Sequence, residues 1–191
     1  MGSADRTNLA ILDAAIATWA QDSGASLGTV ASAAGVGRTT LHRFHPDRAA
    51  LIAAVDAEVR ERFSAATERA RIDEGRAMGA LHRLCVEYLT LGEALRLVFA
   101  DNSVIDPGEW DTGAASHANL IALFARGQQD GSFDTVLDAE WMVLTMWFLL
   151  CGAWMVMVEA DLSRADVTGM LMRTLAGAVG AKPDGFGFAP T

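Results

Sequence analysis

Apolar side chains recur at helical spacing along almost the whole of this 191-residue chain, and this pattern constrains the fold more than any other feature. Leu9, Leu12 and Ile16 begin it, spaced so that they share one face of a helix. No stretch alternates apolar and polar residues at the period of two that is typical of a half-buried strand. Only four residues are Pro and 51% are apolar, which is ample for a helical core. We therefore predict an all-α fold.

Residues that start and stop helices divide the pattern into about nine helices. Ser26 and Asp47 are suitable N-caps, and Pro46 restricts the residue before it to extended conformations. The predicted helices cover residues 5–21, 27–34, 38–44, 48–73, 76–91, 92–100, 109–129, 137–160 and 163–179. Residues 101–108 are predicted to form a loop. Residues 181–191 contain turn residues without periodicity and are predicted to form a flexible tail.

The segment 141–158 contains 18 residues without a charge, the length at which a membrane span becomes a candidate. Its flanks, Glu140 and Glu159, are acidic, whereas the cytoplasmic flank of a span is normally rich in Lys and Arg. We therefore expect a helix buried in a core or dimer interface, and no membrane. The N-terminus lacks a signal peptide, and Cys85 and Cys151 form no disulfide framework. Together these features predict a cytoplasmic protein.

Charge is distributed unevenly along the chain. The formal net charge is −9, which argues against a nonspecific nucleic-acid coat. Eight Arg and eight acidic residues cancel within residues 1–71, so the excess acidity lies entirely in the later part. The window 24–52 has three Arg, one Asp and two His, so it is net positive. Composition therefore leaves room for a small DNA-contacting region at the N-terminal end.

The most informative stretch is residues 27–51. Two short predicted helices are joined through Gly35, with the small Ala31 where they would cross, which is the pattern of a helix-turn-helix. Such a crossing allows the second helix to enter the major groove of DNA. The polar face of that helix supplies Arg38, Thr39, Thr40, His42 and Arg43 as donors to phosphates and base edges.

This stretch resembles the DNA-binding domain of the tetracycline-repressor (TetR) family over about residues 9–55. The matching residues are Ile11, Leu12, Ala14, Ala15, Gly24, Val30, Ala31, Ala34, Gly35, Val36, Thr40, Leu41 and Pro46 through Leu51. Later in the chain only the segment 127–131 is similar to the family. Three positions depart from its pattern: His42 replaces a tyrosine, His45 a phenylalanine that usually packs in the core, and Gly37 a serine cap.

The resemblance implies a homodimer that binds palindromic double-stranded DNA, most often as a repressor that a small molecule releases. Arg48 occupies the place of a cation that usually meets phosphate. The predicted DNA-binding residues are Ser26, Leu27, Arg38, Thr39, Thr40, His42, Arg43, His45 and Arg48. Residues 1–46 are the predicted DNA-binding domain, linked by the helix 47–73, and residues 47–180 the predicted ligand-binding and dimerisation domain.

The helix 137–160 is rich in Met and Trp on every side, which suits both a dimer interface and a pocket for a largely apolar effector. Core packing alone accounts for it equally well. The predicted ligand-binding residues are Phe99, Trp110, His117, Leu120, Phe124, Trp147, Cys151, Trp154 and Met155, with Asn119 a further candidate by position. The predicted dimer residues are Leu144, Phe148, Met155, Leu171 and Leu175.

No catalytic motif, phosphate-binding loop or nucleotide fingerprint is present, so we expect no enzymatic activity and no cofactor. His82 and Cys85 lie three residues apart, but without a second local pair of ligands we expect no metal site. The charged residues 58–71 are predicted to be a solvated helix face with pairs three residues apart. One alternative is a helical small-molecule-binding protein or enzyme with a vestigial helix-turn-helix; another is a membrane-anchored regulator.

Overall fold

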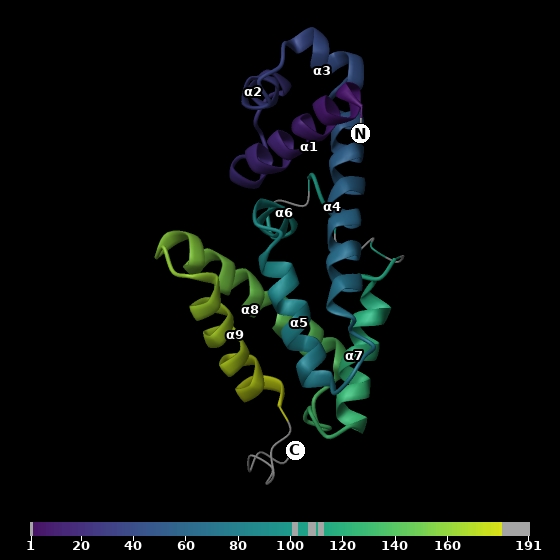
Figure 1. Cartoon of the computed structure of the whole chain (residues 1–191), viewed down its shortest axis with the longest axis vertical. Coiled ribbons are helices and arrows are strands. Elements are labelled where there is room, and N and C mark those ends of the chain that lie inside the picture. The colour runs from purple at the N-terminus through teal and green to yellow at the C-terminus, as the bar shows by residue number, and fades with distance from the viewer. Residues whose placement is uncertain (1, 101–102, 107–109, 111–112, 181–191) are drawn as a thin grey trace. The chain divides into compact units, whose positions relative to one another are not determined.

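The computed structural model describes residues 2–100, 103–106, 110 and 113–180. These residues form nine helices and no strand, apart from an isolated bridge between Phe133 and Gly180. The helices are α1 (Ser3–Gln21), α2 (Leu27–Ala33), α3 (Arg38–Phe44), α4 (Arg48–Ala70), α5 (Ala77–Leu89), α6 (Glu93–Val98), α7 (His117–Gln129), α8 (Ala139–Glu159) and α9 (Arg164–Val179) (Figure 1). The predicted all-α fold is confirmed. The predicted tail lies outside the described residues.

The start of one predicted helix is wrong. The helix predicted over residues 109–129 begins only at His117, because Ser116 caps it and accepts a hydrogen bond from the backbone N–H of Asn119 at 3.4 Å. Upstream, Gly113 has a φ of +87°, which no right-handed helix contains. Trp110 is 6% exposed, so it contributes to burial without belonging to a helix. Apolar spacing indicates that residues are buried, and by itself it does not show that they are helical.

The chain divides into two compact units, and the first comprises Met1–Phe63 and Leu91–Trp110. It contains α1, α2, α3, α6 and the first part of α4, with α1 packed on both α2 and α6. Ile11, Leu41 and Val55 are completely buried in its core. Burying one aliphatic side chain of this size stabilises a fold by about 1.5–3 kcal/mol relative to leaving it exposed.

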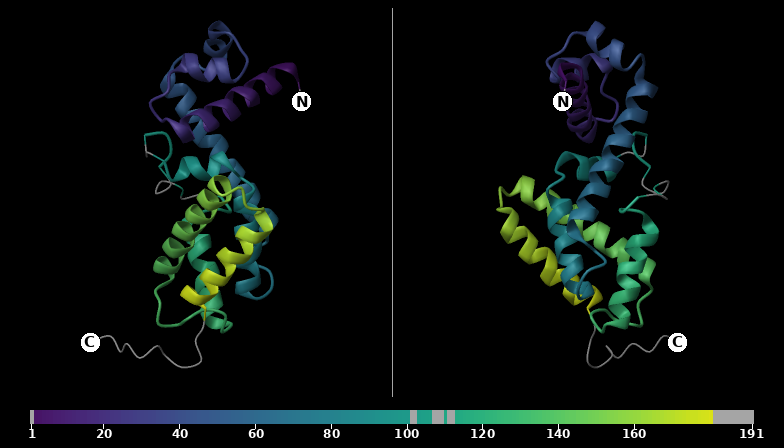
Figure 2. Two further views of the ribbon diagram at one scale, coloured as in Figure 1. Left: turned by 90° about the vertical axis from the view of Figure 1, so that its left-hand side faces the viewer. Right: turned by 45° about the vertical axis from the view of Figure 1, so that its right-hand side comes forward.

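The second unit comprises Ser64–Thr90 and Asp111–Thr191. It contains the last part of α4 together with α5, α7, α8 and α9. Helices α8 and α9 pack on one another as an antiparallel pair joined by a short loop, and α5 packs on α7, α8 and α9 (Figure 2). The predicted division into a DNA-binding domain and a ligand-binding domain concerns function and stays a prediction.

A close approach of backbone and ring fixes the connection from α7 to α8. A Cβ on Gly127 would lie 2.0 Å from Cδ2 of Phe133, so the ring fits only because position 127 has no side chain. Gly131 then turns the chain with a φ of +74°. The carboxylate of Asp130 accepts hydrogen bonds from the backbone N–H groups of Ala77 and Ser132, both at 2.8 Å. The segment 127–131 is therefore a structural turn that ties α7 to the start of α5.

Candidate functional site

The first unit presents a helix-turn-helix built from α2 and α3. Ser26 caps α2 by accepting a hydrogen bond from the N–H of Thr29 at 3.1 Å. Gly35 turns the chain with a φ of +65°, and the N–H of Val36 then donates to the carbonyl oxygen of Ala31 at 3.0 Å. Leu41 is fully buried and anchors α3 to the core. This anchor leaves the rest of α3 facing outward.

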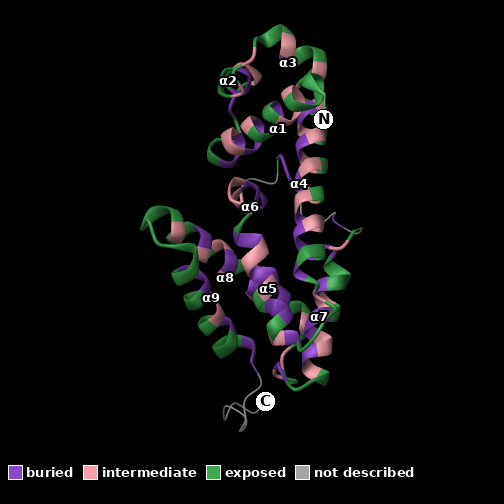
Figure 3. Cartoon of the chain, viewed as in Figure 1, coloured by how far each residue is buried: buried purple, intermediate pink, exposed green. Residues whose placement is uncertain are grey.

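Most of the predicted DNA-binding residues are at least partly exposed, and α2 and α3 carry many exposed residues in Figure 3. Exposed members are Ser26, Arg38, Thr39, His42 and Arg43, and partly exposed members are Leu27, Thr40 and Arg48. Ser26, Leu27, Arg38 and His42 line one shallow hollow between the two helices. Gly28 is not among the residues predicted for this site. A Cβ there would lie 2.8 Å from Nη2 of Arg38, so this glycine makes room for the Arg38 guanidinium between the two helices. The sequence does carry a signal for it. Glycine disfavours helices, yet Gly28 stands in the first turn of a short helix.

The His42 side chain is hydrogen-bonded to the backbone four residues later. Its Nδ1 lies 2.9 Å from the carbonyl oxygen of Pro46, and a carbonyl only accepts, so Nδ1 carries the proton of this hydrogen bond. In this tautomer of the neutral ring the other nitrogen, Nε2, is a hydrogen-bond acceptor. The histidine therefore retains a polar tip at the place of the family's tyrosine.

His45 is not brought to this surface. It is 6% exposed, and its Nε2 lies 2.9 Å from Oδ1 of Asn8 in α1. Burial lowers the pKa of His45 below its ordinary value, which favours the neutral ring. His45 itself occupies the core position, whereas Phe44 is half-exposed, with the Arg43 guanidinium 5.3 Å from its ring. We leave His45 out of the proposed DNA contacts for this reason.

Arg48 has partners within the chain. Its Nη1 donates to the carbonyl oxygen of Ala25 at 2.6 Å, and its Nη2 donates to that of Ser23. The guanidinium also lies 4.8 Å from the ring of Trp19, whose Nε1 donates to the same Ala25 carbonyl at 3.1 Å. Arg48 therefore joins the start of α4 to the loop that precedes α2.

The charged face of α4 differs from its prediction. Arg60 pairs with Asp56 at 2.7 Å and Arg62 with Glu58 at 2.7 Å, so both pairs are four residues apart and not three. Arg62 also reaches Asp13 of α1 at 2.5 Å. Residues three and four apart are both neighbours on a helix surface, so a long Arg side chain can pair at either spacing.

The predicted ligand-binding residues divide between the two units. Phe99 and Trp110 belong to the first, where the ring of Trp110 lies 5.2 Å from that of Phe63. The buried Nε1–H of Trp110 has no hydrogen-bond partner among the described residues. A buried donor of this kind is costly unless an acceptor satisfies it.

In the second unit the predicted ligand residues are only partly gathered. Buried members are Leu120, Phe124 and Trp154, half-buried members are Trp147 and Cys151, and exposed members are His117 and Met155. The Trp147 ring stacks on Tyr88 with centroids 5.4 Å apart and planes 17° apart. The hydroxyl groups of Tyr88 and Thr67 lie 2.8 Å apart and hydrogen-bond, and burial raises the pKa of Cys151. His117 and Met155 face away from this buried group.

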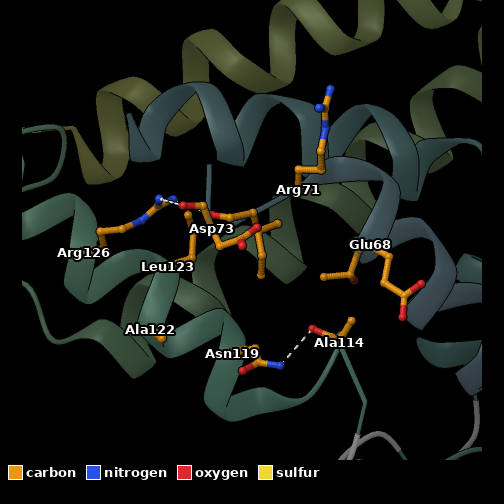
Figure 4. Close-up of a pocket in the computed structure, with 10 residues that line it drawn as sticks. Glu68, Arg71, Asp73, Ala114, Asn119, Ala122, Leu123 and Arg126 are labelled. Carbon is orange, nitrogen blue, oxygen red and sulfur yellow. Dashed lines mark hydrogen bonds between the residues drawn. The ribbon is translucent and has the colours of Figure 1, made fainter. Parts of the chain in front are cut away.

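A groove of about 470 Å³ lies between the end of α4 and α7 (Figure 4). Its lining residues are Thr67, Glu68, Arg71, Ile72, Asp73, Ala114, Asn119, Ala122, Leu123 and Arg126. Of the ligand candidates drawn from the sequence, only Asn119 is among them. The carboxylates and arginines that line the groove were not predicted as ligand-binding residues, because charged residues on a helix usually form a solvated face.

The surface of α8 and α9 is unusually apolar. Of the predicted dimer residues, Leu144, Phe148 and Met155 are 46%, 66% and 47% exposed, whereas Leu171 and Leu175 are buried within the chain. A shallow groove of about 280 Å³ between the two helices is lined mainly by apolar residues. Helix α8 is long and apolar enough to cross a membrane, with a third of its most apolar window buried. Contiguous exposed apolar surface of this kind marks an interaction site.

The chain is similar to several regulators of transcription. It is 41% identical over 107 residues to the HTH-type transcriptional repressor LfrR of Mycolicibacterium smegmatis, a match that spans only 56% of this chain and 57% of that protein. The crystal structure of the TetR-like regulator LfrR in complex with proflavine covers 95% of this chain and 100% of its own, with a TM-score of 0.71 and 28% identity. A TetR family regulator from Marinobacter aquaeolei VT8 has a TM-score of 0.73 at 19% identity, covering 93% and 97% of the two chains, and shows the same fold. No protein-family model matches the chain.

Proposed function

Since the chain belongs to the TetR family of transcriptional regulators, we propose that it is a repressor that binds a palindromic DNA operator as a homodimer and is released by a small, largely apolar effector. It acts in the cytoplasm and catalyses no reaction. The observation that carries this proposal is the outward polar face of α3, anchored by the buried Leu41 and bearing Arg38, His42 and Arg43.

Recognition of DNA combines phosphate contacts with base contacts on this face. Arg43 and Arg38 supply positive charge, and Arg suits bidentate contacts to phosphate or guanine. Thr39, Thr40 and His42 supply shorter donors and acceptors along the same helix. The acidic later part of the chain repels phosphate, which restricts contact to the helix-turn-helix.

Dimerisation uses the exposed apolar face of α8 and α9. Phe148, Leu144 and Met155 would be covered by the same residues of a second copy, as a two-fold interface requires. Leu171 and Leu175 support this face from beneath, because they are buried between helices of one chain. Two copies present two recognition helices, so each half of a palindrome meets one of them.

The effector is proposed to be a planar aromatic molecule. The relative LfrR was crystallised with proflavine, a flat tricyclic dye. In this chain the half-buried ring of Trp147, which stacks on the buried Tyr88, is the aromatic residue to which we assign the dye, and Phe124 and Trp154 are buried in the same unit. A flat ring stacks on such faces, with centroids about 4.5–7 Å apart.

The test is fluorescence anisotropy with a labelled duplex from the region upstream of the chain's own gene. We expect binding whose affinity falls with salt by a slope of about −0.9 per phosphate contacted. Arg43→Ala lowers the affinity and makes this slope shallower, whereas Arg76→Ala, an exposed arginine at the start of α5, changes neither. Absence of binding by a folded dimer would contradict the proposal and favour a small-molecule-binding protein with a vestigial helix-turn-helix.

Effector binding is measured on the protein alone, because a planar cationic dye also inserts between base pairs. We expect proflavine to quench tryptophan fluorescence at a stoichiometric concentration, and Trp147→Ala to weaken its binding. Equal affinity of both proteins would place the dye elsewhere in the molecule.

A further inference from the structure

Two residues of the helix-turn-helix share one space: Gly28 in the first turn of α2 and Arg38 at the start of α3. A Cβ at position 28 would lie 2.8 Å from Nη2 of Arg38, 3.1 Å from its Nε and 3.2 Å from its Cζ. The guanidinium therefore lies against the backbone of α2, where a side chain at position 28 would displace it. Both residues line the shallow hollow between the two helices, together with Ser26 and His42.

The Arg38 guanidinium lies there without a partner of opposite charge. Within the part of the chain that the structure describes, it makes no ion pair and no hydrogen bond. Arg48 differs, because it donates to two backbone carbonyl groups of its own chain. The charge and donors of Arg38 are therefore not committed within the protein. Its place against α2 also limits the conformational entropy that it loses when it binds a ligand.

The position of Arg38 on α3 favours contact with a base. When a recognition helix lies in the major groove, its N-terminal residues contact the base edges. Arg38 is the first residue of α3 and is exposed, whereas Leu41 of the same helix is fully buried. An arginine has only donors, and guanine is the base that presents two neighbouring acceptors, O6 and N7, in that groove. Adenine presents one acceptor beside a donor, which an arginine does not match.

We propose that Gly28 determines specificity by positioning the Arg38 guanidinium to read one guanine in each half of the operator. This inference rests on the proposed function, since it requires that the chain binds palindromic DNA. Gly28 acts through Arg38, so it is a positioning residue and Arg38 is the residue that contacts the base. A side chain at position 28 would move the guanidinium and weaken the preference for that guanine.

The displacement caused by one methyl group is large enough to break such a contact. Ordinary van der Waals contact begins at about 3.4 Å, so a Cβ at position 28 would move Nη2 by about 0.6 Å. Hydrogen bonds from N–H to oxygen span about 2.7–3.2 Å, so this shift exceeds the width of that range. The fold should tolerate the methyl group, because the atoms that move end a flexible side chain and alanine favours a helix more than glycine does.

The experiment has two steps, both with the full chain. Duplexes are first selected from random-sequence DNA, and the half-site positions at which guanine is enriched are recorded. Fluorescence anisotropy then compares the selected duplex with duplexes in which one such G·C pair is replaced by A·T. At one position we expect the unchanged chain to prefer guanine by about five- to a hundredfold, as is typical of a bidentate contact.

Three variants and one control assign this preference. Arg38→Ala and Gly28→Ala should each reduce it to about twofold or less. The double variant should lose no more than Arg38→Ala alone, because both substitutions remove the same contact and their effects are not additive. Gly79→Ala should keep the full preference, since a Cβ there meets only the end of Arg83 at 3.8 Å. In thermal melts, Gly28→Ala should unfold at no lower temperature than the unchanged chain.

Three results would overturn the proposal. One is a Gly28→Ala variant that keeps the base preference of the unchanged chain. Another is an equal loss of affinity for every duplex in Arg38→Ala, with a salt slope shallower by about 0.9, which would assign Arg38 to a phosphate. The third is an additive loss in the double variant, which would show that Gly28 acts without Arg38. A folded chain that enriches no sequence would overturn the proposed function as well, so the two failures are distinguishable.

Discussion

Replacing Arg48 with alanine distinguishes two roles for this residue. The family resemblance predicts a phosphate contact, whereas the structure gives the guanidinium two carbonyl partners and the Trp19 ring. Each hydrogen bond from a charged group contributes about 1.5–3 kcal/mol. A cation–π contact adds about 0.5–1 kcal/mol at an exposed site. Because Arg48 is half-exposed and water replaces part of these contacts, we expect Arg48→Ala to lower the free energy of unfolding by about 3 kcal/mol.

The assay combines urea unfolding, followed by circular dichroism, with a salt series of DNA binding. Arg43→Ala is the matched control, since Arg43 is exposed and its only described contact is with the neighbouring Phe44 ring. We expect Arg43→Ala to change stability by less than about 0.5 kcal/mol and to make the salt slope shallower by about 0.9. Arg48→Ala should show the reverse. The reasoning is refuted if Arg48→Ala leaves stability unchanged and reduces the salt slope as the control does.

Three further substitutions test the packing, the buried histidine and the dimer face. Gly127→Ala sets a methyl against the Phe133 ring and should lower the free energy of unfolding by about 1–3 kcal/mol in urea, whereas Gly79→Ala, with ordinary contacts only, should be neutral or slightly stabilising. His45→Phe should remove a loss of stability on acidification: burial lowers the folded pKa of His45, so below pH about 6.5 the unfolded chain takes up a proton first and folding weakens. Equal pH dependence of both proteins between pH 5 and 7.5 would exclude this role. Phe148→Lys should convert the dimer to monomer in sedimentation velocity, and an unchanged dimer would place the interface elsewhere.

The helical fold and the helix-turn-helix could be predicted because local signals specify them. Ser26 caps α2, Gly35 supplies the positive φ of the turn, and Leu41 is buried as its spacing indicated. The start of α7 could not be predicted in this way. Apolar spacing indicates burial, and Trp110 is buried although it belongs to no helix.

Long-range partners account for what the sequence analysis missed at the candidate sites. Nothing local indicates that Arg48 meets the carbonyl of Ala25, or that Arg126 meets the backbone of the segment that follows α4. His45 was grouped with the DNA-binding residues by its position, but its partner, Asn8, lies 37 residues earlier in the chain. Glu68 was interpreted as part of a solvated face because the groove beside it is formed by α7, about 50 residues later.

Selection of duplexes from random-sequence DNA tests the central claim most directly, because it requires no knowledge of the operator. The full chain is incubated with the pool, bound duplexes are recovered over several rounds, and the enriched sequences are read. The account predicts an inverted repeat whose half-sites lie about 34–36 Å apart, or a modest departure from that spacing, with enrichment lost in Arg43→Ala. A folded, dimeric protein that enriches no sequence, or only a motif without two-fold symmetry, would contradict it.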